Sequence, residues 1–248
     1  MSAATIHLAG ELLQLDPAGA LHWPARRLLA VSDLHFEKGS AAARQGSLVP
    51  PWDTRATLDI LATLLRRYRP QTVVALGDSF HDIGAAARLL AADAERLRAM
   101  AEATAFVWVL GNHDPLPPGF RGESTLEHRV GPLVFRHQAQ PGRVMGELSG
   151  HFHPKASVPV RGTVVTRPCF IADPRRIILP AIGAYTGGLD VRDPAVRALF
   201  PTGGRAFLLG QDRVFSFAIG ARPAMPPPAL TALGGGPDNA GHIRGPKP

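Results

Sequence analysis

Cysteine is almost absent from this sequence, which has 248 residues and a single cysteine, Cys169. One cysteine cannot form a disulfide within its own chain, so small disulfide-stabilised scaffolds are excluded. Long apolar runs are absent too, because no stretch approaches the roughly 18 to 20 apolar residues that a membrane-spanning helix needs. The first residues lack the basic segment and apolar run of an export signal. We therefore expect a cytoplasmic protein that does not enter a membrane.

Lysine is scarce as well, with 3 residues against 24 arginines. Together these cations outnumber the carboxylates by 27 to 20, which gives a formal net charge of +7. A positive balance favours association with a polyanion such as nucleic acid, although an arginine-rich composition can equally reflect a G+C-rich genome. The 45% hydrophobic and 19% charged residues are typical of a folded globular chain.

The first half of the sequence alternates between strand and helix patterns. Three short apolar runs, residues 28–31, 72–76 and 106–110, each end in a polar cluster and are predicted to be buried strands. The segments between them predict helices: Asp53 or Thr54 can cap an amphipathic run that extends to Tyr68, and residues 84–103 are rich in helix formers. In such a β-α-β-α-β unit the strands are parallel, so their polar ends meet at one edge of the sheet.

After residue 111 short β-type segments dominate and predict a second sheet. They are residues 133–136, 158–166, 176–179, and a hairpin of 206–209 with 214–218. Residues 5–23 predict a further hairpin, with its turn at residues 16–19. Residues 221–248 consist mainly of proline, glycine and alanine and are predicted to be disordered. We therefore divide the chain into one domain over residues 1–218 and a tail over residues 219–248.

The sequence also contains a series of side chains that suit metal binding or proton transfer. They are Asp33, His35, Asp78, Asn112, His113, Asp114, His137, His151 and His153. Residues i and i+2 of an extended segment point the same way, so Asp33 with His35, and His151 with His153, can each serve one site. A donor set of nitrogen and oxygen atoms without cysteine suits Mn, Fe, Zn or a similar divalent ion.

In their order along the chain these residues form the pattern D-x-H, G-D, G-N-H-D, H and G-H-x-H, between about residues 28 and 154. The pattern resembles the signature of the calcineurin-like metallophosphoesterases. This resemblance implies an α/β (α+β) fold of four layers, in which a two-sheet β-sandwich is flanked by helices. It also implies a site for two divalent metal ions and the hydrolysis of phosphoesters.

The resemblance implies a role for each residue of the pattern. Seven residues would hold the ions, namely Asp33, His35 and His153 for the first, Asn112, His137 and His151 for the second, and Asp78 for both. His113 would protonate the leaving group, with Asp114 orienting its imidazole. His137 is a single histidine in the pattern, and His128 competes with it for this place.

The residues around these motifs narrow the resemblance. The stretches DLHFEKG (33–39), LGDSFHD (76–82), GHFHP (150–154) and PAIGAYTGGL (180–189) are similar to those of the bacterial ligase-associated DNA-damage-response endonucleases, the PdeM family. Membership would imply a Mn-dependent phosphodiesterase or nuclease that acts in repair with an ATP-dependent DNA ligase, a helicase and an exonuclease. Within the second stretch, His81 and Asp82 could support the site or bind substrate, or could form a surface turn.

Three functions remain open from the sequence. The favoured one is a metal-dependent DNA endonuclease or end-processing phosphodiesterase. The second is a small-molecule phosphoesterase acting on cyclic nucleotides or nucleotide pyrophosphates, which would need a closed pocket. The third is a non-catalytic DNA-binding repair subunit, against which an intact His113 argues. DNA phosphates would meet basic residues in or near the motif loops: Lys38, Arg44, Arg121, Arg136, Arg143, Lys155, Arg161 and Arg167.

Overall fold

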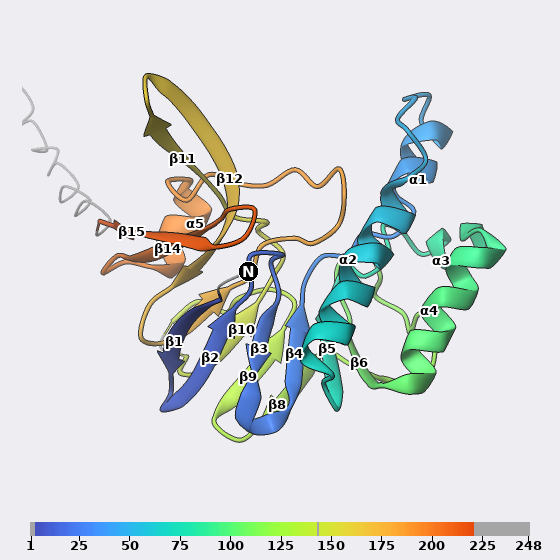
Figure 1. Cartoon of the computed structure of the whole chain (residues 1–248), viewed down its shortest axis with the longest axis horizontal. Helices are drawn as coiled ribbons and strands as arrows, with labels where there is room; N and C mark the ends of the chain where they lie inside the picture. Colours follow the sequence, from blue (N-terminus) through green and yellow to red (C-terminus); the bar gives the residue numbers. More distant parts are fainter. Residues whose placement is uncertain (1–2, 143, 221–248) are drawn as a thin grey trace, which may run out of the picture.

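Two β-sheets packed against each other form the centre of the structure, a computed structural model that describes residues 3–142 and 144–220. The first sheet has the strand order β1-β2-β3-β4-β5-β6-β7. Its strands are β1 (Ala4–Leu8), β2 (Glu11–Leu15), β3 (Leu21–Trp23), β4 (Leu28–Val31), β5 (Thr72–Leu76), β6 (Ala105–Val109) and β7 (Glu123–Thr125). Strands β1 to β4 pair antiparallel and β4 to β7 pair parallel. The carboxyl ends of β4, β5 and β6 therefore lie at one edge (Figure 1).

The second sheet has the order β15-β14-β12-β13-β10-β9-β8, and β11 pairs with β12 beside this path. Its strands are β8 (Glu127–Val130), β9 (Leu133–Arg136), β10 (Glu147–Ser149), β11 (Lys155–Val160), β12 (Thr163–Ala172), β13 (Arg176–Ile178), β14 (Gly204–Leu209) and β15 (Val214–Ile219). Strands β9, β10 and β13 are mutually parallel. The ends of β9 and β10 consequently reach the same edge of the sandwich as β4 and β5.

Helices cover the outer faces of the sandwich. They are η1 (Pro24–Arg26), α1 (Lys38–Arg44), α2 (Asp53–Tyr68), α3 (Ala85–Arg88), α4 (Ala91–Ala103) and α5 (Pro194–Leu199). Figure 1 shows α2 and α4 beside the first sheet and α5 beside the second. None of the helices in the described ranges combines the length and the apolar composition that a membrane span requires.

Alternating side chains in the strands explain these layers. Leu28 and Ala30 of β4 belong to the apolar cluster between the two sheets, whereas Leu29 and Val31 belong to the cluster beneath α2 and α4. A third apolar cluster packs Val196 of α5 against the second sheet. The order helix, sheet, sheet, helix follows from these clusters, and the predicted α/β two-sheet sandwich is confirmed.

The predicted strands at residues 28–31 and 72–76 are β4 and β5, and β6 begins one residue earlier than predicted and ends at Val109. The hairpin predicted near the end of the domain is β14 with β15. Residues 158–166, expected as one β-type segment, belong to two strands that turn at Arg161 and Gly162, both of which have positive φ. Residues 5–23 contain three strands, because the chain also turns at Ala9 and Gly10.

Two helix predictions are wrong in detail. Residues 84–103 form α3 and α4, because Leu89 and Leu90 adopt extended backbone conformations between them. Asp53 and Thr54 do not cap α2, whose N-cap is Trp52. The Asp53 carboxylate instead accepts a hydrogen bond from Gly39 N at 2.8 Å, and Thr54 Oγ1 accepts one from Glu37 N at 2.9 Å. Asp53 therefore ties α2 to the start of α1, and Thr54 ties it to the loop after β4.

The predicted tail lies outside the described residues except for its first two positions, and Ile219 is the last residue of β15. The division of the chain into a domain and a disordered tail stays a prediction.

Candidate metal centre

The predicted ligands gather at one edge of the sandwich. The first sheet supplies Asp33 and His35 after β4, Asp78 after β5 and Asn112 after β6, and the second sheet supplies His137 after β9 and His151 and His153 after β10. Backbone hydrogen bonds join the loops: His35 N donates to Asp78 O at 2.9 Å, and Gly150 N donates to His137 O at 2.9 Å. Five separate loops thus form one site.

Left-handed backbone conformations aim most of these side chains. Asp33, His35, Asp78, His151 and His153 all have φ values between 44° and 69°. Left-handed backbone conformations therefore bring together Asp33 with His35 and His151 with His153, and not the extended geometry assumed from the sequence. Left-handed conformations are uncommon outside glycine and gather at functional sites.

Asp33, His35 and His153 form a first group of ligand atoms, all within 4.8 Å of one another. His153 Nε2 lies 3.1 Å from Asp33 Oδ1 and 3.3 Å from His35 Nε2. Burial lowers the pKa of His35 to about 3, so its imidazole is neutral near pH 7, the form that binds a metal. Ser32, which the motifs did not single out, is buried and donates to Asp33 Oδ2 at 2.6 Å, which fixes this carboxylate.

Asp78, His137 and His151 form a second group within the same distance limit. His137 Nε2 lies 3.4 Å from Asp78 Oδ2, 3.1 Å from His151 Nδ1 and 3.0 Å from Asn112 Oδ1. The other ring nitrogen of His137, Nδ1, donates to the carbonyl of Leu76 at 2.9 Å. That bond fixes the tautomer and turns Nε2 towards the group.

Asp78 belongs to the second group and also lies near the first. Its Oδ2 is 3.4 Å from His137 Nε2 in the second group and 3.9 Å from His35 Nε2 in the first. Burial is the largest influence on Asp78 and opposes its ionisation, but the hydrogen bond and charge of His137, the hydrogen bond from His113 N and the charge of His35 together outweigh burial and lower the pKa of Asp78 to about 2. Two carboxylates with converging imidazole nitrogens are a donor set that fits divalent cations.

His113 lies at the open side of these groups. Its Nε2 is 4.0 Å from Asp78 Oδ2, and 40% of its side chain is exposed. Its Nδ1 donates to the backbone carbonyl of His81 at 2.7 Å. The His81 ring stacks on that of His113 with 5.0 Å between centroids, and its Nδ1 is 3.3 Å from His35 Nδ1. His81 is therefore part of the site, and its carbonyl orients the imidazole of His113.

The role expected for Asp114 is wrong. Its carboxylate does not contact His113 but accepts four backbone hydrogen bonds, at 2.7 to 3.1 Å, from the amides of Asp78, Ser79, Phe80 and Gly111. Burial raises the pKa of Asp114 to about 6, whereas these amides favour its ionised form. Asp114 thus joins the loop after β6 to the loop after β5.

Glycine is required where these loops meet the ligands. A Cβ atom on Gly77, whose φ is +79°, would lie 2.4 Å from His137 Nδ1. A Cβ atom on Gly111 would lie 2.1 Å from Asp78 Oδ1. A side chain at either position would displace a candidate ligand.

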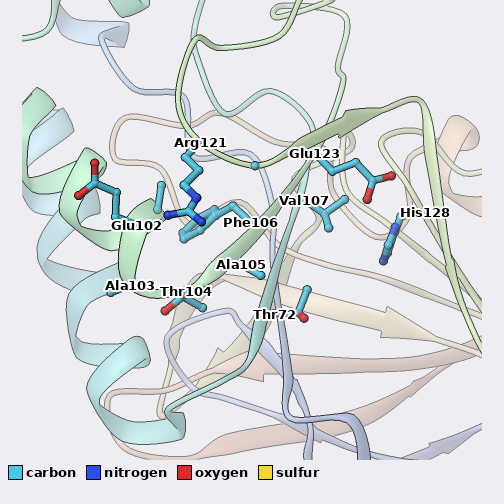
Figure 2. A pocket seen from close by; sticks show the side chains of 12 residues that line it. Thr72, Glu102, Ala103, Thr104, Ala105, Phe106, Val107, Arg121, Glu123 and His128 are labelled. Carbon is cyan, nitrogen blue, oxygen red and sulfur yellow. The ribbon is translucent and has the colours of Figure 1, made fainter.

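His128, the competitor of His137, lies elsewhere. It packs near Phe135 and lines a cavity of about 600 Å³ between the end of α4 and strands β6 and β7 (Figure 2). Arg121, Glu102 and Glu123 also line this cavity, which opens near the starts of β5 and β6. None of the seven predicted ligands borders the cavity, so it is separate from the candidate metal centre.

The basic residues expected near the motifs have different surroundings. Arg136 forms ion pairs with Glu127 and Glu147, and Arg121 lies at the separate cavity. Arg143 lies outside the described residues. Asp82, the neighbour of His81, pairs with Arg88 through contacts of 2.8 and 2.7 Å and forms the surface turn considered for it. Lys38 and Lys155 follow directly on the loops that carry ligands.

A family model described as calcineurin-like phosphoesterase matches residues 26–155, just over half of the chain. The chain belongs to the calcineurin-like phosphoesterase family. It is accordingly a metal-dependent phosphoester hydrolase, which confirms the resemblance that the motifs indicated. The matched range contains the seven predicted ligands and His113.

Two solved structures are similar to this calcineurin-like phosphoesterase. The nuclease MPE of Pseudomonas putida has 31% sequence identity, and the match covers 87% of this chain and 100% of that chain with a TM-score of 0.68. The phosphoesterase YfcE of E. coli has 17% identity over 77% of this chain and 98% of that chain, with a TM-score of 0.38. Among curated protein sequences, none matches this chain significantly. The P. putida nuclease supports a nuclease-type member of the family.

Proposed function

We propose that the protein is a two-metal phosphodiesterase that cleaves DNA. The two-metal site is supported above all by the position of Asp78 Oδ2, which lies 3.4 Å from His137 Nε2 and 3.9 Å from His35 Nε2. A carboxylate between two imidazole groups is placed to be shared by two cations. We assign Asp33, His35 and His153 to one ion, Asn112, His137 and His151 to the other, and Asp78 to both. The donor types and the PdeM-like motifs favour Mn²⁺.

The bound ions would polarise the phosphodiester and supply a nucleophile from water near neutral pH. The protein's own residues hold the donors in place: Ser32 fixes the Asp33 carboxylate, and the carbonyl of Leu76 fixes the His137 ring. Asp114 keeps the amide of Asp78 in position. This support leaves the ligand atoms little freedom before a substrate arrives.

His113 is the residue placed to deliver a proton. Its Nδ1 is engaged with the carbonyl of His81 at 2.7 Å, so Nε2 is the nitrogen that faces the metal groups. Partial exposure of the side chain leaves room for a leaving oxygen next to Nε2. We propose that His113 protonates that oxygen as the phosphorus–oxygen bond breaks.

DNA is proposed as the substrate on two grounds. The first ground is the similarity to the P. putida nuclease, which is 31% identical over 87% of the chain. The formal net charge of +7 favours a polyanionic substrate over a neutral one. The PdeM-like motifs further suggest repair in the cytoplasm, together with an ATP-dependent DNA ligase, a helicase and an exonuclease.

A substrate and metal panel tests the proposal. Single-stranded DNA, double-stranded DNA, RNA, a cyclic nucleotide and bis-p-nitrophenyl phosphate are incubated with the metal-stripped protein and Mn²⁺, Mg²⁺ or Zn²⁺. We expect DNA hydrolysis with Mn²⁺ and two bound ions per chain. Turnover of the cyclic nucleotide without hydrolysis of any DNA would show that the substrate is a small phosphoester and not DNA. One ion per active chain would contradict the two-metal assignment.

His113→Ala tests the proton donor separately. We expect it to retain its metal ions and to lose roughly 100-fold or more in DNA cleavage, the usual size of general acid catalysis. The loss should be smaller on bis-p-nitrophenyl phosphate, whose leaving group scarcely needs a proton. His128→Ala is the matched control, because it removes a histidine outside the site. Equal DNA cleavage by His113→Ala and the wild type would remove His113 from the mechanism.

A further inference from the structure

Lysine is rare in this chain, and two of its three lysines flank the candidate metal centre. Lys38 is the first residue of α1, three positions after His35. Lys155 is the first residue of β11, two positions after His153. The two belong to different halves of the chain, and each follows a ligand of the same group, formed by Asp33, His35 and His153.

Lys155 is held against a loop that covers this group. Its Nζ donates to the carbonyl of Thr186 at 3.1 Å. The loop around Thr186 is anchored at both ends, because Gly183 N donates to Asp33 O at 3.0 Å and Leu189 N donates to Phe152 O at 3.1 Å. Figure 1 shows this segment, in orange, reaching from the β11–β12 hairpin towards α1 and α2.

Lys38, at the start of α1, has no partner of its own among the described residues. Within residues 3–142 and 144–220, its ammonium forms neither a hydrogen bond nor an ion pair. Burial and then the charge of Lys155 lower the pKa of Lys38, while the carboxylates of Asp53 and Asp78 act in the opposite direction. Both lysines follow ligands of the same group, so their like charges act on each other.

Two arginines near this edge are neutralised by carboxylates. Arg88 pairs with Asp82 at 2.7 Å, and Arg136 pairs with both Glu127 and Glu147. In the described ranges Lys155, like Lys38, forms no ion pair with a carboxylate. Two ammonium groups that flank the same ligand group and form no ion pair are arranged to bind an anion, and lysine binds phosphate as a compact point charge.

Resting on the proposed function, we infer that Lys38 and Lys155 together bind the phosphate next to the scissile phosphodiester of a nucleic-acid strand. Among the described residues, neither ammonium forms an ion pair with Asp33 or Asp78, and the proposed phosphate lies beside the scissile phosphate that the metal groups would hold. A mononucleotide with a single cyclic phosphate could not occupy both places. The lysine pair thus makes the site selective for a substrate with at least two consecutive phosphates.

Three dinucleotides test this inference without adding a second cleavable diester: TpT, pTpT and TpTp. The terminal phosphate places an anion one nucleotide away from the only diester, on one side or the other. We expect the wild type, with Mn²⁺, to cleave one phosphorylated form with a kcat/KM roughly 10-fold or more above that of TpT, about the effect of one charge-assisted hydrogen bond. Lys38→Gln/Lys155→Gln should reduce this preference to about 2-fold or less, and Lys38→Arg/Lys155→Arg should restore part of it.

Arg66→Gln/Arg69→Gln is the matched control. It also removes two positive charges, at the C-terminal end of α2, whereas the first turn of α2 contacts the segment that follows His35. This variant should retain both the activity and the preference of the wild type. Circular dichroism and metal content establish that the lysine variants are folded and loaded.

A binding measurement gives a second readout. In a His113→Ala background, the log–log salt dependence of single-stranded DNA binding should become shallower by about 0.7 when both lysines are replaced, since the two lysines bind one phosphate and each phosphate contact contributes about 0.7. Equal kcat/KM values for the three dinucleotides, no cleavage of any of them, or an unchanged preference in the lysine variant would overturn the inference. Cleavage of longer DNA alongside such a result would leave the proposed function standing, whereas failure on every DNA would overturn both.

Discussion

Asp114→Ala should destabilise the fold far more than the loss of an ordinary surface carboxylate. Oδ1 of Asp114 accepts hydrogen bonds from Asp78 N and Gly111 N, both at 2.9 Å, and Oδ2 accepts from Ser79 N at 2.7 Å and Phe80 N at 3.1 Å. Three of these amides belong to fully buried residues after β5. Alanine leaves all four donors without their acceptor.

The magnitude follows from the cost of unpaired donors. A buried amide without a partner costs about 1 to 3 kcal/mol, so four could cost roughly 4 to 12 kcal/mol. Water entering the vacated space would recover part of that cost, and burial of the carboxylate itself is unfavourable, as its raised pKa indicates. We expect a net loss of about 3 to 5 kcal/mol. For a protein of this size each kcal/mol lowers Tm by about 2 to 4 °C, so the melting temperature should fall by roughly 10 °C.

Thermal unfolding followed by circular dichroism, at pH 7 with a chelator, measures this effect without a contribution from metal binding. Asp82→Ala is the control, because its partly exposed ion pair with Arg88 contributes about 1 kcal/mol or less. Asp114→Asn should recover less than half of the loss, since its amide group would face two N–H donors. A melting temperature for Asp114→Ala within about 2 °C of the wild type would refute the reasoning. A large loss of rate with unchanged stability would favour the orienting role first expected for Asp114.

Two further variants probe the centre itself. Asp78→Asn keeps an oxygen that can accept the hydrogen bond from His113 N, 2.9 Å long, but loses the negative charge shared by the two ions. We expect a metal content below two ions per chain and roughly 100-fold slower hydrolysis. Full metal occupancy with normal turnover would contradict the bridging role. Gly183→Ala would place a Cβ atom 2.3 Å from Leu34 O, whereas a Cβ atom on Gly187 meets nothing within 4 Å. Gly183→Ala should therefore lower the free energy of unfolding by about 1 to 3 kcal/mol, whereas Gly187→Ala should leave it almost unchanged. Equal melting temperatures of the two variants would show that the loop does not need the close approach of Gly183 to Leu34 O.

The sequence predicts β4, β5 and β6 well because each is a short apolar run buried on both faces and followed at once by a polar motif. Details decided by tertiary contacts were not predictable in the same way. Asp53 and Thr54 have the chemistry of helix caps, yet they satisfy the amides of Gly39 and Glu37 on a neighbouring loop. The sequence pattern does not show whether such a side chain caps its own helix or bonds to a neighbouring segment, because the same residue types serve both roles.

The partner of His113 shows the same limit inside the site. Asp114 was the nearest carboxylate in sequence, but the backbone bends at residues 112 and 113, and the side chains of His113 and Asp114 take different directions. Asp114 therefore turns inward to the amides after β5, and His113 turns outward to the carbonyl of His81. Asp78 Oδ1 in turn accepts from His113 N at 2.9 Å. These bonds join the G-D and G-N-H-D loops into one unit, so a change in either loop should alter metal binding and the position of the proton donor together.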